Sequence, residues 1–432
     1  MVELKTENST VSAKKFSSHL SAYLNQIHNK DQGFYTAPRD SETVKEINEF
    51  ASKIKGKYNH IVILGIGGSA LGPICLKQSL THSFTERVCD CVRAREVNDF
   101  PKIPHSIPEL FIIDNIDPIL IKELEDVIKL EKTLFIVITK SGTTVETMSQ
   151  YYYFRDKIDE AKLNARDHFV FITSHSKGKL REIATEEKIT TFDIPEKIGG
   201  RFSVLTPVGL LPAKLIGIKI EEILEGANEM CDKFLSEDES RNIPFQLASI
   251  QYALEREGKN IHVLMPYAQK LSGFADWYKQ LLAESIGKKI DNTKKIVHTG
   301  ITPANALGAT DQHSQLQLYN EGPNDKLIMF IEVENMGPEI PIPPIEAANL
   351  TFNKLIQIEK ESTENSLTKN NRPNLTIKID SVNERALGEL FILFEGATAF
   401  LGEFYNINAF DQPGVELSKQ LTKEKIHGNS QT

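Results

Sequence analysis

This 432-residue sequence has little of what marks metal-binding or nucleic-acid-binding proteins. It holds only four cysteines, Cys75, Cys89, Cys91 and Cys231, and none of their spacings matches a zinc site. One residue separates Cys89 from Cys91, which is too close for the usual metal or redox pair. We therefore expect reduced, structural thiols. The net charge of −9 argues against a protein that binds nucleic acid mainly by electrostatic attraction.

The sequence also lacks the apolar segments of exported and membrane proteins. Residues Met1–Leu20 have no basic stretch followed by an apolar one, so we expect no signal peptide and a cytoplasmic location. The stretch Ala386–Tyr405 resembles a membrane span, but it contains Glu389, Glu395 and Glu403. A charge at the centre of a spanning helix costs about 2.5–3.5 kcal/mol. We therefore predict that this stretch is a buried helix in a large soluble core and that the protein has no membrane partner.

What the sequence does contain is a series of short apolar runs that alternate with helical patterns. The runs show no alternation with polar residues, as in parallel strands that helices cover on both faces. The predicted strands are His60–Leu64, Leu110–Ile113, Thr133–Ile138 and His168–Ile172 in the first half, and Ile261–Met265, Lys326–Val333 and Leu375–Ile379 in the second. This rhythm predicts an α/β protein with two doubly wound parallel sheets in one chain.

Helical patterns and their breaks set the predicted domain bounds. Residues 1–40 are predicted to form an N-terminal helical segment, 41–217 a first domain, and 218–432 a second domain with C-terminal helices. Proline and glycine punctuate Ile194–Gly217, which is therefore predicted to be a bridge between the domains. Glu361–Asn374 is predicted to be a loop, although its first part could extend the helix predicted over Ile345–Lys360.

A dense group of hydroxyl-bearing residues directly follows the predicted strand Thr133–Ile138. Residues 139–147 carry five hydroxyls, a lysine and a glycine. Hydroxyls and main-chain N–H groups can surround phosphate oxygens, and a helix that begins there turns the positive end of its dipole toward the anion. We therefore predict a phosphorylated ligand. The residues predicted to contact it are Thr139, Lys140, Ser141, Gly142, Thr143, Thr144 and Thr147.

Glycines after the first predicted strand admit more than one interpretation. Gly65–Pro73 matches the G-x-G-x-x-A turn of dinucleotide-binding proteins, and Asp90 lies about twenty residues further on. The adjacent Gly67 and Gly68, followed by the hydroxyl of Ser69, suit a compact phosphate better than a dinucleotide. We therefore favour a sugar phosphate over NAD. A turn that only lets helix and strand pack closely remains a third interpretation.

Two further segments carry charged side chains that suit catalysis. In Gly199–Ser203, Arg201 follows two glycines, so that its guanidinium can approach a ligand and stabilise an oxyanion. Taken alone, such an arginine is more often part of a surface ion pair. In the predicted helix Asp276–Ile286, Gln280 and Glu284 are four residues apart and share one face. A helical glutamate is usually solvated, but one enclosed in a sugar site can act as a general base.

Two polar segments in the second half add a histidine and a lysine. His313 stands among polar residues in Ala309–Gln317, where a structural histidine is the commoner case. In Phe410–Gln420 a Pro-Gly turn leads into a predicted helix. Gln412 lies before that helix, whereas Lys419 lies inside it and could equally face solvent.

Taken in order, these six segments resemble the glucose-6-phosphate isomerase family in its shorter, bacterial-type form. The matching segments are collinear and span most of the chain: Gly65–Pro73, Thr139–Thr147, Gly199–Ser203, Gln280–Lys288, Thr310–Gln317 and Asp411–Gln420. The resemblance implies two sugar-isomerase (SIS) domains of flavodoxin-like topology and the reversible isomerisation of glucose 6-phosphate and fructose 6-phosphate in glycolysis and gluconeogenesis. It also implies a homodimer with active sites shared between subunits, and no metal or organic cofactor.

The resemblance implies a role for each matching residue. Glu284 would move a proton between C2 and C1 of the open-chain sugar through an enediolate, and Arg201 would stabilise the charge on that intermediate. His313 would help to open the sugar ring, reaching the site from the neighbouring subunit, with Lys419 near the ring oxygen. The other implied substrate contacts are Gly68, Ser69, Gly200, Gln280 and Gln412, together with the residues of the 139–147 segment.

Some positions depart from the animal form of the family. Gly142 and Val145 stand where the animal form has an aromatic residue and a glutamine, so the individual hydroxyl contacts stay open. Thr302–Gly308, which precedes His313, also differs, and the group that orients the imidazole stays open. Three rival functions are kept: an SIS protein that senses a sugar phosphate without converting it, a nicotinamide-dependent oxidoreductase, and an isomerase that also accepts mannose 6-phosphate.

Overall fold

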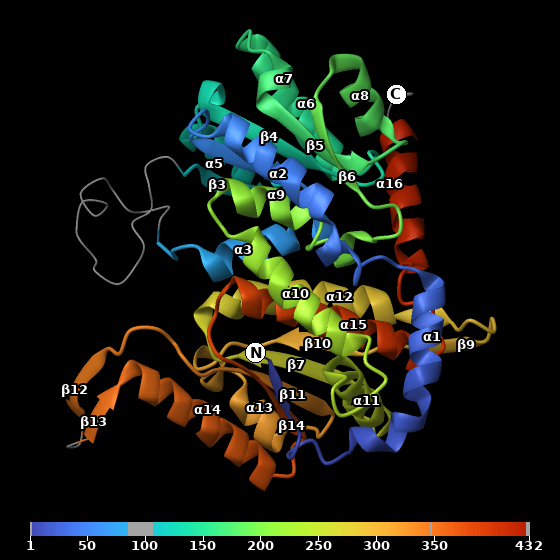
Figure 1. Cartoon of the computed structure of the whole chain (residues 1–432), viewed down its shortest axis with the longest axis vertical. Helices are drawn as coiled ribbons and strands as arrows, with labels where there is room; N and C mark the ends of the chain where they lie inside the picture. Colours follow the sequence, from blue (N-terminus) through green and yellow to red (C-terminus); the bar gives the residue numbers. More distant parts are fainter. Residues whose placement is uncertain (1, 85–106, 346–347, 429–432) are drawn as a thin grey trace.

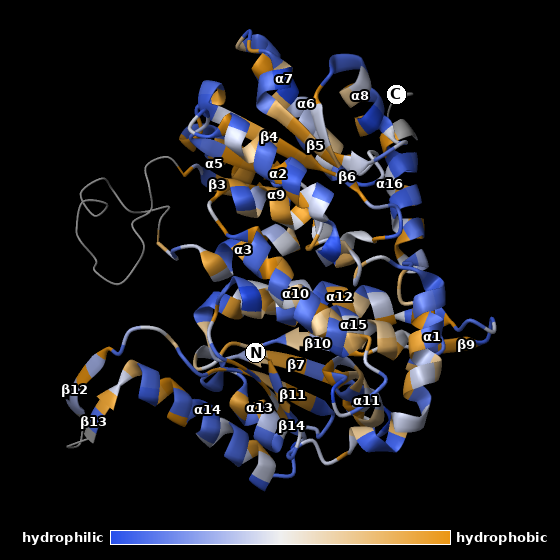
Figure 2. Cartoon of the chain, in the orientation of Figure 1, coloured by the Kyte–Doolittle hydropathy of each residue, from blue (hydrophilic) through white to orange (hydrophobic). Residues whose placement is uncertain are grey.

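The computed structural model describes residues 2–84, 107–345 and 348–428. Two sheets lie at opposite ends of the view in Figure 1, and the helices α10 (Ile220–Phe234), α12 (Ser272–Ile286) and α15 (Glu384–Phe404) lie between them. Figure 2 shows the sheet strands largely in the hydrophobic colours, as expected for strands that helices cover on both faces. Cys89–Cys91, which includes the ribose-binding candidate Asp90, lies outside the described residues.

The first sheet is parallel and has flavodoxin-like strand order. Its strands are β2 (His60–Leu64), β3 (Glu109–Ile113), β4 (Thr133–Ile138), β5 (Phe169–Ser174) and β6 (Thr190–Ile194). In the described part of the chain they are ordered β3–β2–β4–β5–β6, which is the 2-1-3-4-5 order of flavodoxin-like folds. The four strands predicted for this half are confirmed. Strand β6 was not predicted, because it is an edge strand in which only Phe192 and Ile194 are buried.

The second sheet repeats this arrangement with one antiparallel edge. Its strands are β1 (Glu3–Lys5), β7 (Ile261–Pro266), β10 (Thr302–Asn305), β11 (Lys326–Val333) and β14 (Asn374–Ile379). Among the described residues the order is β1–β14–β11–β7–β10, and β1 pairs antiparallel with β14. The three predicted strands are confirmed, whereas the edge strands β1 and β10 were not predicted. Strand β1 belongs to residues 1–40, the predicted N-terminal segment, but it pairs with β14 of the second sheet. The domain bounds given above stay a prediction.

Helices flank both sheets. The remaining helices of the first half are α1 (Leu20–Lys30), α2 (Ser41–Ile54), α3 (Leu71–Leu80), α5 (Pro118–Val127), α6 (Val145–Glu160), α7 (Ala165–His168), α8 (Lys179–Glu187) and α9 (Pro207–Leu215). Those of the second half are α11 (Ile243–Arg256), α13 (Leu316–Glu321), α14 (Phe352–Lys369) and α16 (Glu416–Gly428). Helix α16, at the right of Figure 1, runs beside the first sheet although it comes last in the chain.

The predicted bridge and the predicted loop both contain helical residues in the structure. The bridge Ile194–Gly217 contains α9, which Thr206 caps by accepting a hydrogen bond from the N–H of Val208. Proline suits the first position of this helix, and tertiary packing buries almost all of its residues. This helix within the bridge was not predicted from the sequence. The first part of Glu361–Asn374 extends α14 to Lys369, as the alternative allowed.

The helix predicted over Ile345–Lys360 begins later than expected. The strands β12 (Pro341–Ile345) and β13 (Ala348–Thr351) pair antiparallel before α14 starts. Thr351 then caps α14 by accepting a hydrogen bond from the N–H of Lys354. The prediction missed this hairpin because its prolines interrupt any strand pattern.

Helices α10 and α15 touch backbone to backbone in the centre of the molecule. A Cβ on Gly226 of α10 would lie 1.9 Å from the main-chain oxygen of Arg385, and one on Gly388 of α15 would lie 1.9 Å from that of Ile223. The stretch Ala386–Phe404 is buried throughout, which confirms the predicted core helix.

Three glutamates of α15, Glu389, Glu395 and Glu403, are buried in this core. Lys233 pairs with Glu389 at 3.2 Å, and Lys30 pairs with Glu403. Both carboxylate oxygens of Glu395 are buried without a hydrogen-bond partner among the described residues. Burial raises the pKa of Glu395 well above its ordinary value, because a buried charge is disfavoured relative to the neutral carboxyl. Of the helices that the structure describes, none has the length and apolarity needed to cross a membrane.

Candidate active site

The first glycine motif and the arginine motif meet backbone to backbone. They form the helical turns η3 (Gly67–Ser69) and η6 (Gly200–Phe202). A Cβ on Gly68 would lie 2.2 Å from the carbonyl carbon of Gly200, far inside any normal contact. Gly67 has a φ of +59°, the left-handed conformation that favours glycine. The glycines are therefore needed for the close approach of these two loops.

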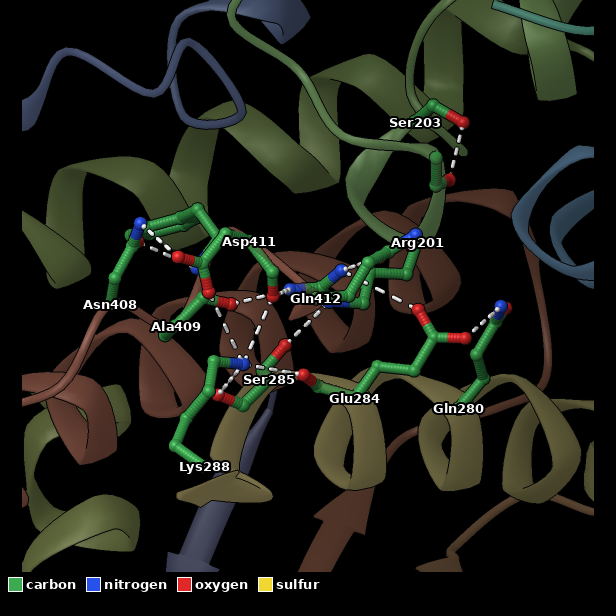
Figure 3. A network of polar contacts seen from close by, with 12 residues as sticks. Arg201, Ser203, Gln280, Glu284, Ser285, Lys288, Asn408, Ala409, Asp411 and Gln412 are labelled. Carbon is green, nitrogen blue, oxygen red and sulfur yellow. Dashed lines mark hydrogen bonds and ion pairs between the residues drawn. The ribbon is translucent and has the colours of Figure 1, made fainter. Parts of the chain in front are cut away.

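Arg201 is buried rather than part of a surface ion pair. Its side chain is 2% exposed, and it reaches from η6 toward α12 and the 408–412 loop (Figure 3). Its N–H groups donate to Ser285 Oγ (2.7 Å), Gln412 Oε1 (2.5 Å) and the main-chain oxygens of Ala409 (2.6 Å) and Asp411 (3.1 Å). Nη1 also lies 3.4 Å from Oε2 of Glu284. Burial lowers the pKa of Arg201, but a guanidinium remains charged at neutral pH.

Glu284 lies on the face of α12 that points away from the core. The core face of this helix carries Tyr278, Leu281 and Ser285, which are spaced by three or four residues and buried. Gln280 Nε2 donates to Glu284 Oε1 at 3.0 Å, which confirms that the two side chains share a face. The Glu284 side chain is 30% exposed, so its carboxylate is held by two donors and is still accessible to a small molecule.

Lys288 is a part of this site that the sequence interpretation quoted without giving it a role. It begins strand β8 (Lys288–Ile290), directly after α12, and its side chain is only 5% exposed. Its ammonium donates to the main-chain oxygens of Glu284, Ser285 and Asp411 at 2.7, 3.0 and 3.0 Å (Figure 3). Burial lowers the pKa of Lys288 to about 8, and the nearby charge of Arg201 acts in the same direction. Its position four residues after Glu284 was the available signal.

The hydroxyl-rich segment forms a compact cluster between β4 and the first turn of α6. Thr139 Oγ1 lies 3.0 Å from Thr144 Oγ1, and Ser141 Oγ accepts hydrogen bonds from the N–H and the hydroxyl of Thr143 at 3.2 and 3.1 Å. Gly142 has a φ of +64°, and a Cβ there would lie 2.8 Å from the main-chain nitrogen of Leu180. The structure therefore gathers four predicted phosphate contacts at the start of a sixteen-residue helix.

Ser69 lies close to this hydroxyl cluster. A Cβ on Gly65 would lie 3.0 Å from Cβ of Ser69 and 3.4 Å from Cβ of Ile138, the last residue of β4. The turn η3 is thus beside the strand end that leads into the cluster, and the first two predicted segments share one edge of the sheet.

Two further predicted phosphate contacts, Lys140 and Thr147, are placed differently from the four hydroxyls of the cluster. The Lys140 ammonium donates to the main-chain oxygens of Glu196 (2.5 Å) and Ile198 (2.9 Å), so it holds the loop that leads to Arg201. Thr147 is 1% exposed, and its hydroxyl has no hydrogen-bond partner among the described residues.

His313 and Lys419 lie outside this network. His313 follows the short turn η8 (Thr310–Gln312) and is exposed. Its loop is shaped by Asp311, whose carboxylate accepts hydrogen bonds from the N–H of Leu307 (2.7 Å) and the hydroxyl of Ser314 (2.5 Å). Lys419 lies on α16, where its side chain is 55% exposed and pairs with Glu416 at 2.8 Å. Gln412, which precedes α16, is joined to the network through Arg201.

Possible metal ligands are scattered. Throughout the described residues, no group of three or more His, Cys, Asp or Glu side chains is arranged to hold a metal ion.

Comparison with known families and proteins gives one consistent result. The family model of phosphoglucose isomerase matches residues 39–336 and 347–431. The glucose-6-phosphate isomerase of Carboxydothermus hydrogenoformans is 43% identical over 420 residues, which cover 95% of this chain and 88% of that protein.

Solved structures agree with the fold. A hypothetical protein from Thermus thermophilus superposes with a TM-score of 0.87 at 30% identity, covering 99% of this chain and 100% of that one. A glucose-6-phosphate isomerase from Chlamydia trachomatis gives a TM-score of 0.85 at 22% identity, covering 100% of this chain and 89% of that one. A putative phosphosugar isomerase from Silicibacter pomeroyi gives a TM-score of 0.52 at 9% identity, covering 89% of this chain and 99% of that one. This is a likeness of fold alone.

Proposed function

Since this chain belongs to the phosphoglucose isomerase family, we propose that its reversible isomerisation of glucose 6-phosphate and fructose 6-phosphate uses Glu284 as the base. The observation that carries this proposal is the geometry of the carboxylate. It lies between the amide of Gln280 and the buried guanidinium of Arg201, and it remains 30% exposed. A carboxylate that is fixed and accessible can take a proton from one carbon of a sugar and return it to the next.

Arg201 is proposed to stabilise the enediolate that forms when the proton leaves. Its charge is fixed in a buried position, 3.4 Å from Glu284 and 2.5 Å from the side-chain oxygen of Gln412. A preorganised cation in a site of low dielectric stabilises an oxyanion without reorganising during the reaction. Gln280 and Gln412, on either side of this cation, are proposed to line the sugar.

The hydroxyl cluster of residues 139–144 is proposed to hold the phosphate of the substrate, together with Ser69 and the main chain at Gly68 and Gly200. The cluster lies at the carboxyl edge of the first sheet, where open α/β sheets bind ligands. Binding energy from a group remote from the reacting carbons can hold C1 and C2 against the base.

Ring opening is proposed to require a second copy of the chain. The amide of Asn305, at the end of β10, donates to the carboxylate of Asp276 on α12 at 2.7 Å. Glu284 lies eight residues further along α12, which is about 12 Å along the helix. His313 comes after β10 in the chain, and its side chain is exposed rather than directed into the Glu284 network. We therefore infer a homodimer in which His313 from one subunit reaches the Glu284 site of the other.

The pathway and the compartment are also proposals. The reaction belongs to glycolysis and gluconeogenesis, and the cytoplasm is the compartment that we propose. The comparisons lend no support to a sensor without activity or to a second activity on mannose 6-phosphate.

A coupled assay tests the reaction. Purified protein is given fructose 6-phosphate with glucose-6-phosphate dehydrogenase and NADP, and we expect steady formation of NADPH. Saturable binding of fructose 6-phosphate without NADPH would instead identify a sensor.

Mixing two inactive variants tests the shared site. Glu284→Gln and His313→Ala are unfolded and refolded together. In a hybrid dimer, one site then combines an intact Glu284 with an intact His313. Random pairing should restore about one quarter of wild-type activity, because half of the dimers are hybrids with one good site each. Activity that stays at the level of the separate variants would show that the two residues do not act across subunits.

A further inference from the structure

Lys288 is a buried charge whose donors are all used on the main chain. Its ammonium has three N–H donors, and three carbonyl oxygens accept them within 3.0 Å. The carboxylate of Asp411 adds an ion pair at 3.7 Å. A buried charge is tolerated only when it is paired and fully hydrogen-bonded, so this arrangement constrains all of its partners.

Two of the three carbonyls belong to the last turn of α12. The oxygens of Glu284 and Ser285 are among the last four of a helix that ends at Ile286, where carbonyls have no partner within the helix. A cation at this end of a helix also interacts favourably with its dipole. Lys288 therefore fixes the peptide that carries Glu284.

The third carbonyl joins this helix end to another part of the chain. The oxygen of Asp411 accepts hydrogen bonds from both Lys288 (3.0 Å) and Arg201 (3.1 Å). Figure 3 shows contacts from both cations to Asp411, which directly precedes Gln412 in the 408–412 loop. One ammonium thus holds the end of α12 and the loop before α16 in fixed relation.

We propose that Lys288 is a positioning residue of the isomerase site, which sets the distance between Glu284 and Gln412 by holding the main-chain oxygens of residues 284 and 411. This inference rests on the proposed function of Glu284. It does not place Lys288 in contact with the substrate.

Two substitutions separate the ammonium from the rest of the side chain. Lys288→Met removes the charge and all three donors while keeping an unbranched chain. Lys288→Arg keeps the charge, but its donors lie in one rigid plane and cannot meet three carbonyls at one point. The matched control is Lys289→Met, because Lys289 is the exposed neighbour on the same strand.

The first readout is the division of the effect between kcat and KM for fructose 6-phosphate. Lys288→Met should lower kcat about 10- to 100-fold, since a small misplacement of a catalytic group has effects of this size. KM should change less than about threefold, because the hydroxyl cluster does not touch Lys288. Lys288→Arg should be intermediate in kcat, and Lys289→Met should equal the wild type. Each rate is normalised to the folded fraction, measured by circular dichroism.

The second readout uses the wild type and is independent of whether a variant folds. The charged groups that face Lys288 are Arg201 from η6, Glu284 from α12 and Asp411 from the loop. With a pKa near 8, Lys288 loses its charge and one donor as the pH rises above that value. The kcat should therefore fall as the pH rises through about 8. The free energy of unfolding should rise over the same pH range, because the unfolded chain keeps this proton up to a pKa of about 10.4 while the folded protein loses it.

A fall in kcat through pH 8 that disappears in Lys288→Arg, observed by NMR without coupling enzymes, supports the inference. An unchanged kcat in folded Lys288→Met, or a wild-type kcat that is flat from pH 7 to 9.5, overturns it. Wild type and Glu284→Gln are measured in parallel. Inactive wild type, or a fully active Glu284→Gln, would instead mean that the proposed function itself has failed.

Discussion

Replacing Glu284 by glutamine removes the proposed base while keeping its shape. The carboxylate accepts hydrogen bonds from Gln280 (3.0 Å) and Arg201 (3.4 Å). A glutamine at position 284 can accept from Arg201 with its oxygen and donate with its nitrogen to the side-chain oxygen of Gln280. That oxygen is buried and has no partner among the described residues, so a rotated amide can receive this bond. We therefore expect the variant to fold with a change in stability within about 0.5 kcal/mol.

The loss of rate should be large because the amide cannot take a proton. A positioned general base contributes about 10²- to 10⁴-fold to a rate. We expect kcat to fall about 10³-fold or more, which corresponds to about 4 kcal/mol in the activation barrier. Substrate affinity should change less than about threefold. The hydroxyl cluster of residues 139–144 lies between β4 and α6 and does not touch residue 284 on α12.

Two measurements separate loss of chemistry from loss of binding. NMR in D₂O follows the exchange of the C2 proton of glucose 6-phosphate with solvent, and calorimetry follows the affinity for the same substrate. The control is Glu222→Gln, because Glu222 is also a helical glutamate but forms a surface ion pair with Lys219 at 2.7 Å. This control should behave as the wild type in both measurements.

A retained exchange rate would refute the assignment. If Glu284→Gln exchanges the C2 proton at more than about one tenth of the wild-type rate, the base is another residue. If affinity and thermal stability fall together with the rate, Glu284 is a structural residue of α12.

Three other predictions concern packing, phosphate binding and pH. Gly68→Ala places a methyl group 2.2 Å from the carbonyl carbon of Gly200, so we expect a loss of about 1–3 kcal/mol in urea unfolding together with lower kcat; an alanine with wild-type stability would contradict the observed contact. Ser141→Ala combined with Thr144→Ala should raise KM at least about tenfold and change kcat little, because both hydroxyls belong to the proposed phosphate cluster; an unchanged KM would move the phosphate elsewhere. Burial raises the pKa of Glu395 in the folded state, whereas the unfolded chain releases this proton above a pKa of about 4.3. We therefore expect stability to fall as the pH rises above about 4.3, by up to about 1.4 kcal/mol per pH unit. Glu395→Gln should therefore gain stability relative to the wild type between pH 5 and 7 in thermal melts, and a difference that does not depend on pH would show that the buried carboxyl is ionised.

The central strands could be predicted from sequence because each is a continuous apolar run. His60–Leu64, Thr133–Ile138 and Lys326–Val333 begin and end in the structure where the runs do. Edge strands carry less of this signal, since one side of each pairs with no neighbour. Strand β6 exposes part of its length, and β10 contains a proline, so neither was predicted.

Helix α9 was missed for a different reason. Its two prolines and one glycine are breakers in isolation, and only burial against the rest of the core makes the helical conformation favourable.

The sequence by itself determined the shared face of Gln280 and Glu284, because four residues make about one turn of a helix. It also determined the hydroxyl cluster, whose members are neighbours along the chain. Only the tertiary structure decided that Arg201 is buried against Glu284, that Lys288 joins α12 to the 408–412 loop, and that His313 lies apart from both. These relations connect residues far apart in sequence, and no local periodicity encodes the distance between loops that meet only when two sheets pack together.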